Sequence, residues 1–444
     1  MVRLIFLFLL LCTCSLKTEE PLPNLIRAKI VKKTIIKIKP DKSLKKYLRA
    51  NFFVAEYEDP DIDLTQLDAS VTSIPFITAI IPVIWAAGSN YSIETMDKDL
   101  FYALKKIKKV FKQFYPSLSW SGKLIPGKLI KNSINQPIKK LGILFSGGLD
   151  AVASCFHYFA ADQLLITIGG SDVKYYQKSL WQKIKKQNQK FAQTYQKSIS
   201  FIRSNFTSFI KGKLLKQLSS ELPQWWALTS QSLGYTGLTA PLLHHYGIQH
   251  LIIGSSHTAD LPMPYGTHPL IDNEINFADS TVYHDLGNLD RAEKIKLLCK
   301  KSKQYNVQHP NLRVCWGKDK NGGNCCECEK CLRTINELLI MNKNPQKFGF
   351  AINTDTAIKK TKEFLQVKQN LKARQLWHWE CVQKQIIYSK KQFDLSLTEH
   401  FEWLSNLQLE NLAKSPFDLK SWKEQDQNLA ILWNESIKKR PPIH

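Results

Sequence analysis

The chain has 444 residues, of which 43% are hydrophobic and 23% charged, and it contains no internal repeat or low-complexity segment. The composition is ordinary for a globular protein, and the absence of repeats excludes a repeat architecture. The length leaves room for two or three domains. Lys and Arg number 62 against 38 Asp and Glu, a formal net charge of +24, which favours anionic partners such as nucleotides, nucleic acid or an anionic membrane face. Because the lysines are spread along the chain, a solvated basic surface explains the charge at least as well as a nucleic-acid patch.

Residues 1–23 look like a targeting signal. Arg3 is followed by the apolar run Leu4–Leu11, a pattern typical of a bacterial signal peptide and too short for a secure transmembrane helix. A misplaced start codon, an export or anchor signal, and an ordinary buried segment all fit this pattern.

Residues 24–137 are predicted to form an N-terminal α+β domain. Apolar and basic residues alternate over Ile26–Ile38, as in half-exposed strands. The apolar run Ile74–Ala87 contains two prolines, which favours a buried core segment over a membrane span. Asp97–Phe114 has the apolar spacing of an amphipathic helix, and the polar stretch Ser117–Pro137 predicts a domain boundary.

A parallel α/β core is predicted for residues 138–350, followed by a helical C-terminal region over 351–444. Short apolar strands alternate with helical stretches, which implies βαβ units and a parallel sheet. The predicted strands are Leu141–Phe145, Leu164–Ile168, Ser198–Ile202 and Leu251–Gly254, and the predicted helices are Ala151–Ala160, Trp225–His245 and Leu332–Met341.

The first of these strands ends in a loop suited to phosphate, since Ser146-Gly147-Gly148-Leu149-Asp150 leads straight into a helix. Glycines allow a tight turn and let an anion approach the peptide N–H groups, and a helix start adds unpaired donors and the positive end of its dipole. Ser146 adds a hydroxyl, and Asp150 could cap the helix or hold a magnesium ion bound to phosphate. A turn that merely needs glycines is the simpler alternative.

The segment Phe145–Ala151 resembles the Ser-Gly-Gly-x-Asp-Ser signature of PP-loop ATP pyrophosphatases. These enzymes split ATP between the α- and β-phosphates and adenylate a substrate. Ala151 stands where the signature has its last serine, which removes one hydroxyl donor but leaves the backbone loop intact. The resemblance implies an adenine nucleotide alpha hydrolase-like, Rossmann-like core in which the leaving pyrophosphate is surrounded by Ser146, Gly147, Gly148, Leu149 and Asp150.

Five cysteines fall within residues 315–331, at the spacing of a metal site. Cys325-x2-Cys328-x2-Cys331 supplies three thiolates from one turn, and Cys315 supplies a fourth by closing a loop. Four thiolates match a closed structural zinc site, and such a cluster indicates a reducing compartment more than a disulfide framework. Cys326 is the spare cysteine, and an iron–sulfur cluster is the competing assignment.

The cysteine spacing is similar to that of 7-cyano-7-deazaguanine synthase, a PP-loop enzyme of queuosine biosynthesis that converts a deazaguanine carboxylate to a nitrile with ATP and ammonia. Leu289–Glu293 also resembles that family's Leu-x-Lys-Ala-Glu segment, with Arg291 in place of lysine, which implies a cation near phosphate. A surface helix start is the simpler alternative. Residues 24–350 look more like an uncharacterised, synthase-like group that shares a string matched here by Cys315-Trp316 and Asn324–Thr334.

Two further loops are expected at the carboxyl edge of the sheet, where ligands bind in open parallel sheets. Gly169 and Gly170 could give the adenine and ribose room. The loop Ser255–Pro269 offers candidate substrate contacts or proton-transfer groups, although a structural role is the simpler expectation for each histidine. These candidates are His257, Asp260, Tyr265 and His268.

The sequence therefore predicts an AMP-forming, ATP-dependent ligase that activates a small carboxylate or amide for attack by ammonia or another amine. Its expected cofactors are ATP, Mg²⁺ and Zn²⁺, and the expected catalytic residues are Ser146, Asp150 and Arg291. A tRNA-modifying enzyme that thiolates through adenylation, and a non-catalytic nucleotide-binding protein, are the alternatives. The need for ATP favours the cytoplasm, with export or anchoring left open by residues 1–23, and no membrane span is expected.

Overall fold

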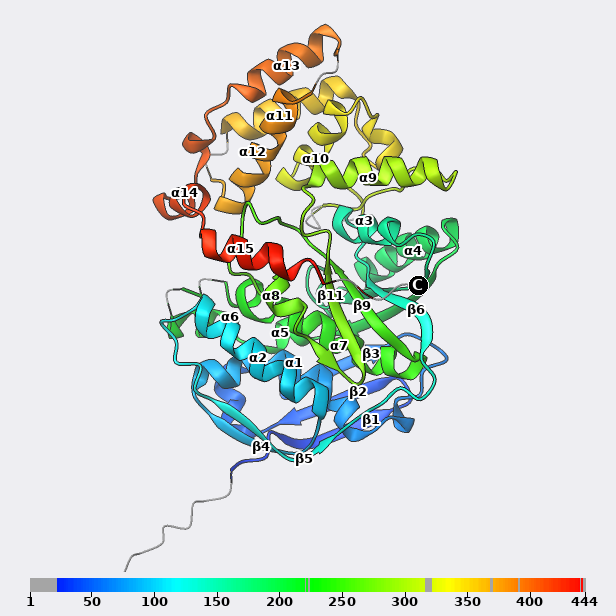
Figure 1. Ribbon diagram of the computed structural model, residues 1–444, viewed down its shortest axis with the longest axis vertical. Coiled ribbons are helices and arrows are strands. Elements are labelled where there is room, and N and C mark those ends of the chain that lie inside the picture. Colours follow the sequence, from blue (N-terminus) through cyan, green and yellow to red (C-terminus); the bar gives the residue numbers. More distant parts are fainter. Residues whose placement is uncertain are drawn as a thin grey trace, which may run out of the picture.

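A nine-stranded sheet runs through the protein, with strands in the order β1-β2-β3-β8-β7-β6-β9-β11-β10. The computed structural model (Figure 1) describes residues 22–219, 221–222, 224–315, 322–367, 370–389, 392–439 and 441. Residues 1–21 of the predicted signal-like segment lie outside this description. The strands are β1 (Ile26–Lys32), β2 (Ile35–Pro40), β3 (Phe53–Tyr57), β4 (Asn90–Asp97), β5 (Lys123–Ile130), β6 (Ile138–Leu144), β7 (Asp162–Gly169), β8 (Ser198–Ser204), β9 (Ile248–Gly254), β10 (Asn276–Phe277) and β11 (Ser280–Asp285).

The centre of the sheet is parallel, as predicted. Strands β8, β7, β6, β9 and β11 pair in parallel, and antiparallel strands flank them on both sides. The mixed α/β class is therefore confirmed. The helices are α1 (Ala69–Ala87), α2 (Lys98–Phe114), α3 (Leu149–His157), α4 (Lys178–Thr194), α5 (Phe206–Phe209), α6 (Gly212–Leu215), α7 (Gln231–Tyr246), α8 (Pro269–Asp272), α9 (Arg291–Gln304), α10 (Glu329–Ile340), α11 (Thr354–Val367), α12 (Ala373–Ile387), α13 (Leu395–Ser405), α14 (Pro416–Lys423) and α15 (Gln427–Ser436).

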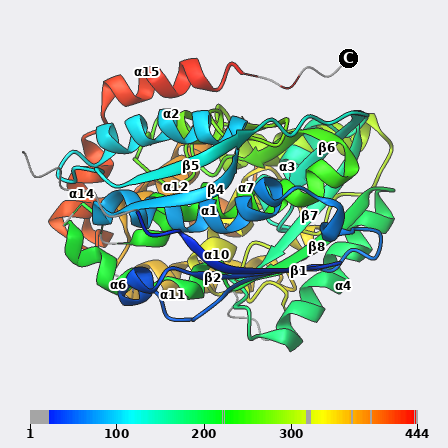
Figure 2. The same ribbon diagram turned by 90° about the horizontal axis from the view of Figure 1, so that it is seen from below.

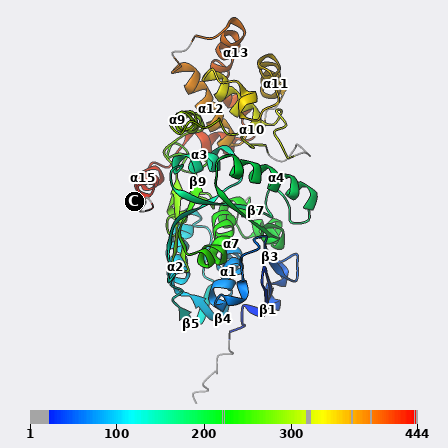
Figure 3. The same ribbon diagram turned by 90° about the vertical axis from the view of Figure 1, so that its right-hand side faces the viewer.

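Each face of the sheet is covered by its own hydrophobic core. Successive side chains of a strand point to opposite faces: on β7, Leu164 and Ile166 belong to the core shared with α1 and α7, and Leu165 belongs to the core shared with α3 and α10. Figure 3 shows the two helical layers on either side of the strands. Burial on both faces explains why the central strands are almost continuously apolar.

The segment predicted as a separate N-terminal domain contributes three strands to this same sheet. Tyr57 on β3 pairs with Ile202 on β8 in antiparallel register, and β2 and β1 follow outward. The predicted boundary Ser117–Pro137 is also not simply a linker, since it contains β5, which pairs in parallel with β4 in a second, two-stranded sheet. Pro126 and Gly127 interrupt the apolar pattern of β5 and hide the strand from sequence analysis.

The apolar helix α1 lies in the core beneath the sheet (Figure 2). It is the one described helix long and apolar enough to cross a membrane, and 89% of its apolar window is buried inside the protein. Its contact with α7 is very close, because a Cβ on Gly237 would lie 1.9 Å from Thr78 Oγ1. Packing of this kind supports the predicted buried core segment, and core helices of soluble proteins pass the same length and composition test.

The C-terminal region is helical, as predicted, and most of it packs around α10 at the top of Figure 1. Its last helix, α15, returns to the edge of the sheet. There Trp433 Nε1 donates to the Gly287 carbonyl at 2.9 Å, and its ring contacts His268 and His284.

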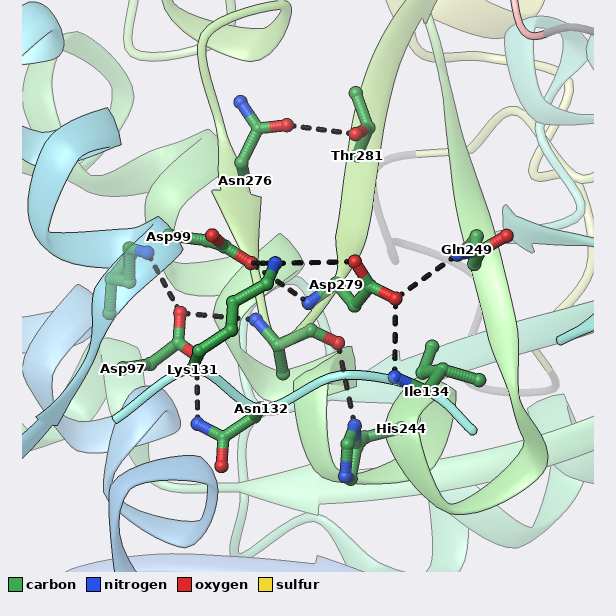
Figure 4. Close-up of polar contacts among 12 residues, drawn as sticks. Asp97, Asp99, Lys131, Asn132, Ile134, His244, Gln249, Asn276, Asp279 and Thr281 are labelled. Atoms are coloured by element: carbon green, nitrogen blue, oxygen red, sulfur yellow. Dashed lines mark hydrogen bonds and ion pairs between the residues drawn. The ribbon is translucent and has the colours of Figure 1, made fainter. Parts of the chain in front are cut away.

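A buried aspartate ties the two sheets together (Figure 4). Asp97, at the N-cap of α2, accepts hydrogen bonds from the Leu100 N–H at 2.8 Å, the Ala278 N–H at 3.1 Å and Asn132 Nδ2 at 2.8 Å. Its side chain therefore fixes the start of α2, the β10–β11 turn and the segment after β5 at one point.

Asp97→Ala is expected to lower the free energy of unfolding by about 2–4 kcal/mol, because it removes a helix cap and leaves buried donors unpaired. Urea unfolding followed by circular dichroism measures the change. Asp63→Ala is the matched control, since Asp63 caps only a three-residue 3-10 helix and should cost about 1 kcal/mol or less. Equal losses in the two variants would contradict this role for Asp97.

Candidate functional site

The glycine-rich loop lies at the carboxyl end of β6, between β7 and β9. Gly147 has φ +78°, a left-handed conformation that glycine adopts without strain, and a Cβ there would lie 2.9 Å from Asn188 Oδ1. Gly148 is the N-cap of α3, which has no side-chain cap. The Gly148 N–H donates to Ser146 Oγ at 3.2 Å. The start of α3 therefore presents peptide N–H groups beside a flexible, glycine-built turn, as expected for an anion site.

A cavity of about 230 Å³ opens beside this loop, slightly below the usual range of roughly 300–1,000 Å³ for small-molecule sites. Its walls come from the ends of β6, β7 and β9, from α7, and from segments next to the cysteine cluster. Cationic and anionic side chains from four separate parts of the chain reach it: Asp150, Asp172, Arg313, Lys330 and Arg374.

Asp150 is surrounded by cations. Lys294 Nζ lies 3.1 Å from Asp150 Oδ1, and Arg291 Nη1 lies 3.7 Å from Asp150 Oδ2. Burial alone would raise the pKa of Asp150, but the charges of Lys294, Arg291 and Lys330 outweigh it and hold that pKa well below its usual range. The carboxylate is therefore ionised at neutral pH, at the entrance of α3.

The cations behind the loop form a buried network with carboxylates, which includes an ion pair between Arg333 and Glu329 at 3.2 Å. Arg291, 3% exposed, also contacts Glu337 at 3.5 Å and donates to Thr334 Oγ1 at 2.8 Å. Burial raises the pKa of Glu337 to about 7, although Arg291 and Arg333 oppose that shift. Burial, followed by the nearby charge of Arg291, lowers the pKa of Lys330 to about 8. Asp150 and Asp172 oppose that shift, so Lys330 lies between carboxylates and further cations.

Arg313 backs the glycine-rich loop directly. Its N–H donates to the Gly147 carbonyl at 2.7 Å, and its Nη2 donates to the Ser146 carbonyl. Burial lowers the pKa of Arg313. Arg313, which lies two residues before Cys315 in sequence, therefore stabilises the turn conformation of the glycine-rich loop.

Close packing explains why residues 169 and 170 are glycines. A Cβ on Gly169 would lie 2.8 Å from the Trp181 ring, and one on Gly170, with φ +128°, would lie 1.9 Å from the Ser204 carbonyl. Neither residue lines the cavity. The residues that follow do line it, namely Ser171, Asp172 and Val173.

The loop Ser255–Pro269 splits into two environments, and two of its candidates face the cavity. His257 and Tyr265 both line it, with their rings stacked at 5.2 Å and 10°. His257 Nε2 is buried and has no hydrogen-bond partner in the described part of the chain. Burial, then the charge of Arg374, holds the pKa of His257 well below its usual range, so this imidazole is neutral and open to a ligand hydrogen bond.

The other two candidates in this loop lie elsewhere. His268 is fully buried between Phe114 and Trp433, with ring centroids 4.9 and 4.7 Å away, and its Nδ1 caps α8 by accepting from the Leu270 N–H. Asp260 is exposed, accepts a hydrogen bond from Thr258 Oγ1, and does not line the cavity. The structure thus gives His268 a structural role and places Asp260 at the surface.

The four predicted ligand cysteines come together. The Sγ atoms of Cys315, Cys325, Cys328 and Cys331 all lie within 4.8 Å of one another, close to the sulfur–sulfur distance of about 3.8 Å that tetrahedral Zn–S bonds require. The Cys328 N–H donates to Cys325 Sγ at 3.3 Å, a contact that stabilises a thiolate. The four cysteines could therefore hold a zinc ion.

The spare cysteine is confirmed as lying outside this group. Cys326 has φ +55° and directs its Sγ toward the Asn324 carbonyl at 3.6 Å. Asn324 in turn accepts from the Val314 and Cys315 N–H groups and donates to the Leu312 and Gly349 carbonyls. This asparagine therefore positions the irregular segment Leu312–Cys315 that carries the first ligand. Trp316 lies outside the described residues.

The cysteine cluster and the cavity share a wall, because Lys330 immediately precedes the ligand Cys331 and Arg313 lies two residues before Cys315. Sequence analysis missed both cations, together with Lys294 and Arg374. Lys294 could have been found, since it lies one helical turn beyond Arg291 on the same face of α9. Arg374 carries no local signal, because it comes from α12 in the C-terminal region.

No protein-family model matches this chain, and a search of curated proteins finds no match either.

Proposed function

We propose that this protein is an ATP-dependent adenylating enzyme that forms AMP and pyrophosphate while activating a small carboxylate or amide. The observation that carries the proposal is the glycine-rich loop at the carboxyl end of β6, opening onto a cavity lined by three half-buried cations, Arg313, Lys330 and Arg374. Triphosphate is a common metabolite group whose negative charge matches the cations of the cavity. A loop between a strand and the start of a helix is a recurrent binding site for it.

In this proposal the phosphates lie against the start of α3, with Ser146 as a hydroxyl donor and Arg313 behind the loop. Asp150, held by Lys294, and Asp172, which follows the neighbouring strand β7, are the carboxylates that could hold magnesium. A magnesium ion would neutralise charge on the phosphates and favour departure of pyrophosphate. Lys330 would bind the same charge from the side of the cysteine cluster.

The second substrate is proposed to occupy the part of the cavity near His257, Tyr265 and Arg374. The neutral His257 offers one hydrogen bond, and Arg374 offers a positive charge for a carboxylate. No described cysteine or serine nucleophile is paired with a base at the cavity. The residues therefore act by orientation and charge stabilisation, with the substrate oxygen as the attacking atom.

The tRNA-thiolation alternative has less support. Such chemistry needs a reactive thiol at the site, and no cysteine lines the cavity among the residues that the structure describes. Cys155 is fully buried in α3, and burial raises its pKa to about 12, so it would be a poor nucleophile. The non-catalytic alternative still rests on Ala151, which lines the cavity where the signature has serine.

Incubation with ATP, magnesium and a panel of carboxylates and amides, with or without ammonia, tests the proposal by chromatography of AMP and pyrophosphate. Substrate-dependent AMP with equal pyrophosphate is expected. ATP binding without AMP for any compound would favour the non-catalytic alternative. Absence of ATP binding at micromolar to millimolar concentrations would refute the proposal.

Lys330→Met is expected to weaken ATP binding at least tenfold, because it removes a half-buried charge beside the proposed triphosphate site. In the unchanged protein, Lys330 is protonated below about pH 8 and neutral above it. ATP affinity should therefore fall by up to about tenfold per pH unit above pH 8, and the variant should lose this dependence. Isothermal titration calorimetry across pH 6–10 with Lys300→Met as the exposed control separates this effect from general charge loss.

A further inference from the structure

A second cavity, of about 310 Å³, lies far from the glycine-rich loop, among α1, α2, β4 and β5. Its floor is apolar and includes Trp85, Met96 and Leu104. We call it the α2–β5 hollow. Beside it, Ile125 on β5 is 46% exposed and Tyr102 on α2 is 50% exposed, so apolar side chains also project around its mouth.

Three lysines form the rim of the α2–β5 hollow: Lys105, Lys108 and Lys123. Their long stems cover apolar surface, with Lys105 Nζ 4.3 Å from the Phe101 ring centroid and Lys108 Nζ 5.8 Å from that of Trp85. None of the three forms an ion pair in the part of the chain that the structure describes. Burial, then the charges of Lys112 and Lys123, lowers the pKa of Lys108 to about 8, and Lys108 Nζ donates to the Gly122 carbonyl.

The surrounding surface has the same sign. Helix α2 carries six lysines and one aspartate, and β5 carries two lysines and no acidic residue. Together, the rim and its surroundings put positive charge around an apolar hollow. A nucleic-acid duplex would match the charge but keeps its bases stacked inside the helix. An anionic lipid has both an acidic headgroup and an apolar chain.

The chain preceding the described residues joins the fold at this same small sheet. Ser92 on β4 donates to the Leu22 and Pro23 carbonyls, and its register partner on β5 is Ile125 at the hollow. The 21 residues before Leu22 include the apolar run Leu4–Leu11. In Figures 1 and 3, β4 and β5 lie at the end of the molecule opposite α13. The hollow and the attachment point of that apolar run therefore share one end of the protein.

We propose that the α2–β5 face docks the protein on an anionic lipid bilayer. The three rim lysines would lie at the headgroups, and the apolar hollow would receive part of an acyl chain. This proposal is independent of the adenylation proposal, because the two sites share no residue.

Co-sedimentation of the full chain with phosphatidylcholine vesicles, with and without phosphatidylglycerol, tests the docking face. Binding to the anionic vesicles that weakens at high salt is expected. Lys105→Gln, Lys108→Gln and Lys123→Gln together should weaken it roughly 100-fold, at about fivefold per lysine. Ile125→Ser should weaken it several-fold without changing the salt dependence. Melting temperatures of all variants verify that each one is folded.

The matched control removes the same charge elsewhere, through Lys178→Gln, Lys186→Gln and Lys190→Gln on the exposed side of α4. This variant should bind vesicles nearly as the unchanged protein does. An equal loss in both triple variants, or no binding of the unchanged chain to anionic vesicles, would overturn the proposal. Full vesicle binding by the rim variant would also overturn the proposal, since the apolar N-terminal run alone would then explain membrane binding. Tighter binding of a polyanionic RNA than of the vesicles, through the same rim lysines, would overturn it as well.

Discussion

Cys331→Ser is expected to abolish zinc binding and to lower the free energy of unfolding by at least about 3 kcal/mol. Cys331 is fully buried among the other three ligand cysteines, and loss of a structural metal is among the largest single-residue effects. Elemental analysis should find about one zinc per chain in the unchanged protein and almost none in the variant. Because Lys330 and Arg313 adjoin the cluster, ATP affinity should fall as well.

Cys326→Ser is the control for this prediction. Cys326 lies one residue from a ligand and is almost as buried, but its sulfur is directed away from the other four. The variant should keep its zinc and most of its stability. Iron in place of zinc in the unchanged protein would contradict the assignment of the metal as zinc, and zinc loss in both variants would contradict the choice of ligands.

Asp150→Asn is expected to reduce AMP formation by about 10²–10³-fold, a loss typical for removal of a group that stabilises charge at a reacting centre. The reason is that Asp150 is the ionised carboxylate closest to the start of α3 and the proposed magnesium ligand. ATP binding should be retained or become tighter, because the variant removes negative charge from a cationic cavity. Single-turnover AMP formation at saturating ATP measures the effect.

Asp150 also neutralises Lys294 and Arg291, so its replacement will cost stability, and rates must be compared per folded molecule. Ser146→Ala is the second variant, since it removes only a loop hydroxyl and should lower AMP formation about tenfold without a change in melting temperature. Asp260→Asn makes the same chemical change at a residue outside the cavity and should leave the rate of AMP formation unchanged. Full activity of both the Asp150 and Ser146 variants would remove these residues from the proposed role.

Several features could be predicted because they are encoded by adjacent residues. The apolar run of β6 followed by Ser146-Gly147-Gly148 predicts a strand, a tight turn and a helix start, and the structure has all three. The cysteine spacing likewise predicts the ligands and the spare. These signals depend on local backbone freedom and on the chemistry of single side chains.

Other features depend on which distant segments meet. Two histidines of one loop have opposite surroundings: His257 faces the cavity, and His268 is fixed between Phe114 and Trp433. Nothing in their neighbouring residues distinguishes them. The same holds for Arg374, which reaches the cavity from the C-terminal region, and for β3, where Tyr57 pairs with Ile202 of β8, 145 positions later in the chain.

The parallel core, the turn at the end of β6 and the four-cysteine group follow from the amino-acid sequence, because periodicity, glycine and thiolate spacing act within a few residues. Long-range packing settles that residues 24–57 extend the same sheet and that cations from α9 and α10 surround Asp150. Burial and electrostatic neighbours depend on segments that are distant in the chain. Local residue pattern carries the propensity to form an element but not the identity of its neighbours.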